Sequence, residues 1–70
     1  MKRIEGKIKK RVWRRDKFHC RLRISPYCIK KLNIDNATVD HKIPLDKGGT
    51  NDLDNLQTAC RPCNQLKDNH

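Results

Sequence analysis

Two short stretches of the chain hold residues whose types and spacing could do chemistry. The first is "TVDHKIPLDKGG", in which Asp40 and His41 stand side by side after a short apolar run and before a glycine turn. The second is "CRPC", residues 60 to 63, a pair of cysteines separated by two residues. An imidazole titrates near neutral pH and can accept a proton, and closely spaced thiolates bind metal ions. The chain therefore carries candidates for proton transfer and for metal binding.

The four cysteines, Cys20, Cys28, Cys60 and Cys63, predict a structural zinc site. A Cys-x2-Cys turn lets two thiolates hold one tetrahedral zinc, and two more are needed to close the site. Cys20 and Cys28 can supply them, although seven residues lie between them. Disulfides are the alternative, and the lack of an early apolar run like a signal peptide disfavours them. Four thiolates make a closed, structural site, so catalysis must occur elsewhere.

Size and composition explain why such a site is needed. Only 34% of the 70 residues are hydrophobic and 36% are charged. A domain this small seldom buries enough apolar surface to hold its fold alone. No stretch is long enough to cross a bilayer, and we expect a single domain, residues 1–70, in the cytoplasm.

The charge of the chain is uneven. Residues 1–31 contain 13 Lys and Arg against 2 acids, a net +11, whereas residues 32–70 contain 4 against 6, a net −2. A concentrated cationic surface attracts a polyanion, most commonly the phosphate backbone of a nucleic acid. A charged face that only meets solvent, or a tail that contacts an acidic protein, is the alternative.

The pattern predicts the order helix, loop, strand, long loop, strand, helix. Ile4, Ile8 and Val12 recur at helical spacing and predict a basic helix over about residues 7–17. "ATVDHKI", residues 37–43, alternates like a strand that Pro44 ends, and "LQTA", residues 56–59, predicts a second strand. From residue 61 onward the chain can form a helix.

The stretch "VDHKIPLDKGGTNDLDNLQTACRPCNQLK", with the "RRDKFHC" lead-in, resembles the HNH endonuclease family of ββα-metal, or His-Me finger, nucleases. The resemblance covers roughly residues 11–67. It implies a small α+β fold with a ββα core over about residues 37–70, a basic N-terminal helix and a structural zinc site made of four cysteines. The family's three motif positions correspond to His41, Asn55 and Asn64, and many members have a histidine at the position of Asn64.

The resemblance implies a metal-dependent DNA endonuclease that leaves a 5′-phosphate and a 3′-hydroxyl. His41 would be the general base, Asn55 would brace the loop and orient that base, and Asp40 and Asn64 would bind one divalent cation. Their hard oxygens suit Mg²⁺ or Mn²⁺, with Ni²⁺ or Zn²⁺ as alternatives. Neighbouring strand residues point to opposite faces, so Asp40 and His41 can serve one site only if the strand ends or twists there.

Further residues have weaker assignments. Asp68 lies on the helical face of Asn64 and is a possible third ligand, whereas His70 would point away. His19 is expected at the surface, and the aromatic residues Trp13, Phe18 and Tyr27 are expected to pack in the core or the zinc loop. The expected DNA contacts are Lys10, Arg11, Arg14, Arg15, Arg61 and Lys67.

Two other functions stay open from the sequence. A zinc-bound DNA-binding module without catalysis would need neither Asp40 nor His41. An accessory subunit of a larger machine is the second alternative, since small free-standing HNH proteins resemble those encoded beside phage packaging genes. This resemblance implies the cytoplasm of a bacterium or of a phage-infected cell.

Overall fold

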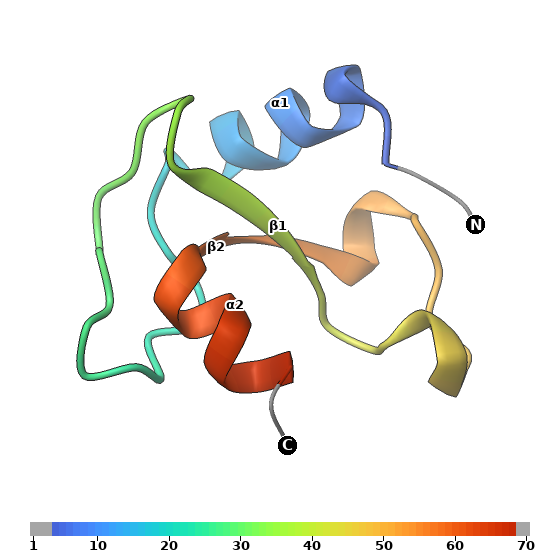
Figure 1. Ribbon diagram of the computed structural model, residues 1–70. Helices are drawn as coiled ribbons and strands as arrows, with labels where there is room; N and C mark the ends of the chain where they lie inside the picture. Colours follow the sequence, from blue (N-terminus) through green and yellow to red (C-terminus); the bar gives the residue numbers. More distant parts are fainter. Residues whose placement is uncertain (1–3, 69–70) are drawn as a thin grey trace.

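The computed structural model describes residues 4–68 and forms a small α+β domain. Helix α1 spans Gly6–Arg15, strand β1 Ala37–His41, strand β2 Leu56–Cys60 and helix α2 Arg61–Asp68. Two short 3-10 turns, Leu45–Lys47 and Leu53–Asn55, interrupt the loop between the strands. The predicted order of elements is confirmed, and Figure 1 shows α1 and α2 on either side of the two strands.

Helix α1 is shorter than predicted and ends at Arg15 instead of residue 17. Lys17 and Phe18 have φ angles of 54° and 57°, in the left-handed region that terminates helices. The Phe18 amide donates to the carbonyl of Trp13 at 2.8 Å, which closes the last turn. Val12 and Trp13 are buried against the strands, so α1 covers one face of the sheet.

The strands pair antiparallel with Asp40 opposite Gln57 and His41 opposite Leu56. Because side chains alternate along a strand, Asp40 and His41 start toward opposite faces. Asp40 lies on the face that contacts α2, where it bonds Lys67. Strand β1 was predicted to reach residue 43 but ends at His41, so the acid and the histidine stand at the point where the chain leaves the sheet.

The loop after β1 folds back tightly on itself. Gly48 has a φ of 91°, and a Cβ at Gly49 would collide with the carbonyl oxygen of Ile43. The Gly49 amide donates to the Pro44 carbonyl at 2.9 Å. Glycine at position 49 therefore lets the two sides of this loop approach closely.

The cysteines form part of the hydrophobic core, in a chain that has few other apolar residues to bury. Cys20, Leu32, Cys60 and Cys63 form one buried cluster, with Phe18 packed against it. The expectation that Tyr27 also packs is wrong, since 79% of that side chain is exposed. Tyr27 belongs to the turn after Ser25, where its amide donates to the Ser25 hydroxyl at 3.0 Å while its side chain stays in solvent.

Asp16 connects the end of α1 to the sheet. Its carboxylate accepts hydrogen bonds from the Thr58 amide at 2.9 Å and from the Arg15 guanidinium at 3.0 and 3.1 Å. Arg15 in turn donates to the carbonyls of Leu53 and Leu56 at 2.8 and 2.6 Å. Arg15 and Asp16 together therefore join the end of α1 to the 3-10 turn before β2 and to β2 itself.

Replacing Asp16 by asparagine is expected to lower the free energy of unfolding by about 1.5–3 kcal/mol, as for hydrogen bonds to a charged group. Burial acts to raise the pKa of Asp16, but the bonds from Arg15 and Thr58 lower it below the ordinary value of 3.8. The contribution is therefore complete above the unfolded-state pKa and is lost only as pH falls through the lower folded value. Denaturant unfolding should give the same difference between the two proteins from about pH 7 to about pH 5.

The exposed Asp35→Asn is the matched control for this measurement and should leave the unfolding free energy unchanged within about 0.5 kcal/mol. An Asp16→Asn protein as stable as the wild type would contradict the assigned link.

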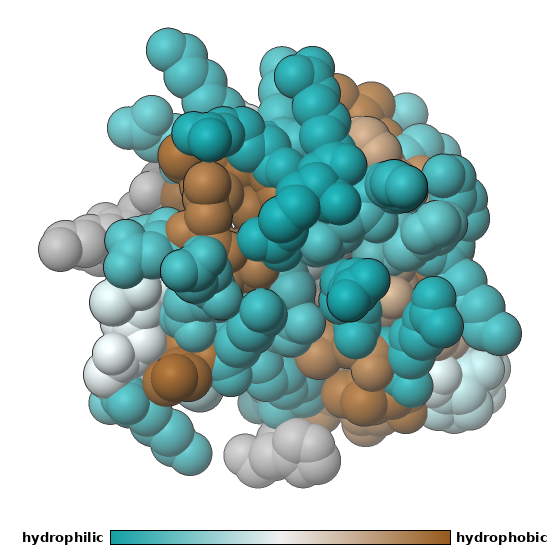
Figure 2. Space-filling view, turned by 180° about the vertical axis from the view of Figure 1, so that it is seen from behind, coloured by the Kyte–Doolittle hydropathy of each residue, from teal (hydrophilic) through white to brown (hydrophobic). Residues whose placement is uncertain are grey.

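The surface is mostly polar, in line with the mean hydropathy of −1.01. Figure 2 shows hydrophilic side chains spread over the back of the molecule, with apolar patches between them. Among the described residues, no helix is both long enough and apolar enough to span a membrane. His70, weighed above as a ligand, lies outside the described residues.

Candidate functional site

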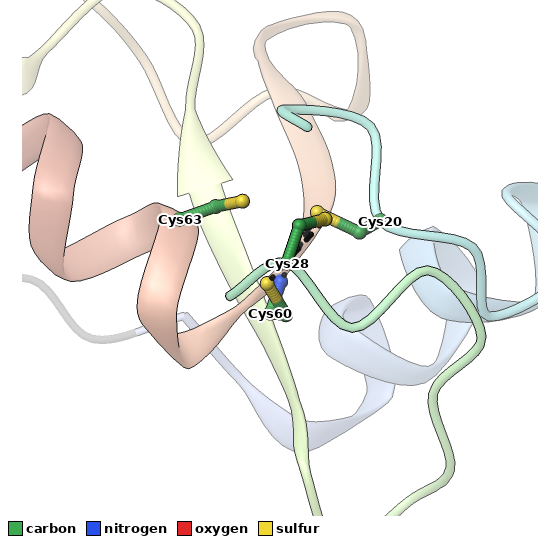
Figure 3. Close-up of side chains that lie close together, drawn as sticks. All are labelled: Cys20, Cys28, Cys60 and Cys63. Carbon is green, nitrogen blue, oxygen red and sulfur yellow. Dashed lines mark hydrogen bonds between the residues drawn. The ribbon is translucent and has the colours of Figure 1, made fainter. Parts of the chain in front are cut away.

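The four cysteine sulfurs converge at the junction of three segments. Cys20 and Cys28 come from the loop after α1, Cys60 ends β2 and Cys63 lies in the first turn of α2 (Figure 3). All four sulfurs lie within 4.8 Å of one another, and those of Cys28 and Cys60 are 3.9 Å apart. Tetrahedral zinc with bonds of about 2.3 Å separates its sulfurs by about 3.8 Å. All four cysteines are free thiols, so the cluster fits a structural zinc and not disulfides.

Backbone amides prepare these sulfurs for negative charge. Ser25 donates to the Cys63 sulfur, Ile29 to that of Cys60 and Cys60 to that of Cys20, each at 3.4 Å. Hydrogen bonds to a thiolate stabilise its charge. Although seven residues lie between Cys20 and Cys28 in the sequence, both sulfurs belong to the same cluster.

The thiols differ in acidity. Burial raises the pKa of Cys28 to about 12, helped by hydrogen bonds with the other cysteines. Burial also acts to raise the pKa of Cys63, but bonds from the Ser25 amide and from Cys60 lower it to about 7. A bound cation would have to displace the remaining thiol protons, so metal affinity falls as pH falls.

Asp40 is buried and fully engaged at the end of β1. Only 5% of the residue is exposed, and its two carboxylate oxygens accept from the Lys67 ammonium at 3.0 and 2.7 Å. Gln57 donates to the same carboxylate at 2.8 Å. A buried carboxylate needs such partners, because an unpaired charge would be costly. Lys67 also donates to the His41 carbonyl at 2.7 Å and so holds the end of β1 against α2.

His41 is half-buried and has one observed ring partner. Its Nε2 lies 2.7 Å from the Oδ1 of Asn51, a loop residue ten positions further on. Sequence reasoning assigned nothing to Asn51, since an asparagine in a Gly- and Asp-rich loop has the signature of a turn residue. Only the folding back of the loop brings it to His41.

Asn64 lies on α2 beside β1. Its Nδ2 donates to the Thr38 hydroxyl at 3.1 Å, which fixes the side chain. Asp40, His41, Asn64 and Asp68 all line one hollow of about 430 Å³ at the end of β1. Asp40 and His41 thus border the same space although their side chains start toward opposite faces, because the strand ends there.

Asn55 ties the loop together without touching the ring of His41 in any observed hydrogen bond among the described residues. Its Nδ2 donates to the carbonyls of Ile43 and Thr50 at 3.0 and 2.8 Å, and its Oδ1 accepts from the Ile43 amide at 2.9 Å. Its own carbonyl accepts from the Lys42 amide at 2.8 Å. One side chain therefore fixes both sides of the loop that follows His41.

The basic residues assigned to DNA differ in their surroundings. Lys10, Arg11 and Arg14 are exposed on α1, and Arg61 is exposed at the start of α2. Arg15 and Lys67 are held in the intramolecular bonds described above. Contact with DNA stays a prediction for all six, and Arg15 and Lys67 would have to exchange existing bonds to make it.

Two antiparallel strands followed by a helix, with a histidine where the first strand ends and four clustered cysteines, define a small zinc-stapled domain of the His-Me finger type. The model of the family described as HNH endonuclease matches residues 20–70, and the chain belongs to this family. Members of this family are nucleases that act on DNA, so the chain belongs to the nuclease class of enzymes. Neither the curated proteins nor the solved structures contain a significant match.

Proposed function

We propose that the protein is an endonuclease that hydrolyses phosphodiester bonds in DNA, with His41 as the general base and one divalent cation as cofactor. One observation carries the proposal. His41, Asp40 and Asn64 border a single hollow, although Asn64 lies on another element 23 positions further along the chain. A histidine beside two hard oxygen donors is the set of groups that cation-assisted hydrolysis of a phosphate ester needs.

His41 would remove a proton from the attacking water. A histidine is suited to this step because it is neutral near physiological pH and becomes a moderate acid once it holds the proton. His41 lines the hollow at the end of β1 and is only half-buried, which leaves room for a DNA strand to approach it. Asn55 would keep the following loop in place and so support the base.

The donors at the hollow fit a hard divalent cation. Asp40 and Asn64 would hold it, with Asp68 as a third candidate from the same helix. When bound, the cation supplies positive charge to the phosphate oxygens and the leaving group. Lys67 neutralises Asp40 in the structure, so a cation would share this carboxylate with the ammonium or displace it.

The charge distribution supports DNA as the substrate. Lys10, Arg11 and Arg14 form an exposed basic face on α1. His41 also lines a second hollow of about 660 Å³, together with Lys9 and Arg61. We propose that the cleaved strand passes His41 between the two hollows, so that cationic side chains hold the phosphates on one side. Such contacts position DNA without reading its sequence.

The test is cleavage of a supercoiled plasmid by purified, zinc-loaded protein with and without added Mg²⁺ or Mn²⁺. Nicked plasmid should accumulate only with the added cation, and Asn64→Ala should require a higher cation concentration. Asp35→Ala, at an exposed loop position, is the control and should cut like the wild type. Binding of the plasmid without cutting under every cation would reject the isolated chain as a nuclease and favour a DNA-binding module or a subunit that acts with partners.

A further inference from the structure

We propose that Asn51 is a positioning residue that holds the His41 ring with its proton on Nε2, so that Nδ1 carries the lone pair that accepts a proton. The ring contact is direct, since Nε2 of His41 and Oδ1 of Asn51 are 2.7 Å apart. The catalytic part of this inference rests on the proposed function. The placement of the ring proton does not, because it belongs to the folded chain itself.

The chemistry of the amide decides which nitrogen is protonated. An amide oxygen only accepts hydrogen bonds, so the hydrogen between the two groups must come from His41. A neutral imidazole has a single N–H, and placing it on Nε2 leaves Nδ1 as the acceptor. The bond therefore selects one of two tautomers and orients the ring at the same time.

The backbone on both sides of Asn51 is held. Asn55 donates to the Thr50 carbonyl at 2.8 Å, directly before Asn51. On the other side, the Asp52 carboxylate accepts from the Thr50 hydroxyl at 3.0 Å, and the Asp52 amide donates to the same hydroxyl at 3.3 Å. Asn55 thus acts on the base indirectly, because it fixes the loop that contains Asn51.

Asn51 also lies near the start of α1. It lines a hollow with Ile4 and Glu5, which precede α1, and with Ile8 in the first turn of α1. Both Asn51 and His41 are half-buried, so water competes less for their hydrogen bond than it would at an open surface. An amide, unlike a carboxylate, orients the ring without adding negative charge beside a site that must receive a phosphate.

The first arm of the test measures the ring proton by NMR, using the zinc-loaded full chain labelled with ¹⁵N, at about pH 8, where an ordinary histidine is neutral. We expect a directly observable Nε2–H resonance for His41 and an Nδ1 without a proton. Asn51→Ala should lose this resonance to exchange with water, and Asn51→Asp should retain it because a carboxylate oxygen also accepts. Protonation of Nδ1 in the wild type, or an unchanged Nε2–H signal in Asn51→Ala, would overturn the inference.

The second arm measures plasmid cleavage by the same three proteins. Asn51→Ala should lower kcat roughly tenfold to a hundredfold, as expected for a misplaced catalytic group, with KM for DNA changed about twofold or less. Asn51→Asp should cut faster than Asn51→Ala, because its carboxylate orients the ring, but more slowly than the wild type, because it adds negative charge beside the phosphate site. Equal kcat for Asn51→Ala and the wild type would remove the positioning role. If the wild type does not cut, the proposed function fails, whereas the NMR arm still decides whether Asn51 sets the tautomer.

Discussion

Replacing His41 by alanine is expected to lower the rate of plasmid cleavage by about 10²–10⁴-fold, the usual contribution of a general base. No other histidine among the described residues lines the hollow, so no second imidazole is at hand to take the proton. The substitution removes a half-buried side chain at the end of β1 and leaves the sulfur cluster intact. We therefore expect unchanged zinc content and unchanged plasmid binding.

The measurement is single-turnover nicking at saturating protein, followed on agarose gels, with plasmid binding measured at the same salt concentration. His19→Ala is the matched control, because it removes the other described histidine, which lies beside Cys20 and outside the hollow. This control should cut at the wild-type rate. If His41→Ala cuts at the wild-type rate while control reactions without added cation show no cleavage, His41 is excluded as the base.

Removing the structural zinc is expected to unfold the domain. Binding of zinc to small Cys-rich domains contributes about 10–16 kcal/mol near pH 7, whereas a whole small domain has a net stability of about 5–15 kcal/mol. The cluster joins the loop after α1 to β2 and α2, and three of its four cysteines are completely buried. Without the metal, these segments keep only a two-stranded sheet and a small apolar core to hold them together.

Circular dichroism before and after treatment with a strong chelator tests this expectation. The signal should become that of an unfolded chain and recover on addition of about one equivalent of Zn²⁺ per chain but not of Mg²⁺, which disfavours thiolate ligands. Cys63→Ser should behave like the chelated protein at neutral pH. Since zinc competes with protons for the thiolates, the metal should be lost more readily as pH falls. A chelated protein with an unchanged spectrum would show that the core suffices.

Local sequence signals determined the elements and the metal ligands. The spacing of Ile4, Ile8 and Val12 predicted α1. The β-branched alternation of "ATVDHKI" predicted β1 and the short stretch "LQTA" predicted β2, both to within two residues. "CRPC" and two further cysteines predicted a four-sulfur cluster, which the structure contains. These predictions succeed because helical spacing, strand alternation and the narrow coordination preference of zinc all act over a few residues or demand one residue type.

The end of α1 and the position of Tyr27 depended on more than local pattern. The sequence pattern of α1 could continue past Arg15, but Lys17 and Phe18 adopt positive φ angles that end the helix. The Asp16 side chain instead accepts a hydrogen bond from the Thr58 amide, 42 positions away in the sequence. The energy of that distant bond is absent from any short window of sequence. Tyr27, expected to pack as an aromatic residue, is exposed instead.

The surroundings of the site were decided by tertiary structure alone. The sequence singled out Asp40, His41, Asn55 and Asn64, yet it could not show that Lys67 neutralises Asp40 or that Asn51 accepts from His41. Lys67 reaches Asp40 across 27 positions because α2 packs against β1, and Asn51 reaches His41 because Gly49 and Asn55 fold the loop back. Residue types and spacing thus determined which groups carry the chemistry, whereas long-range packing determined the partners that hold them, since hydrogen bonds between distant positions exist only after the chain has folded.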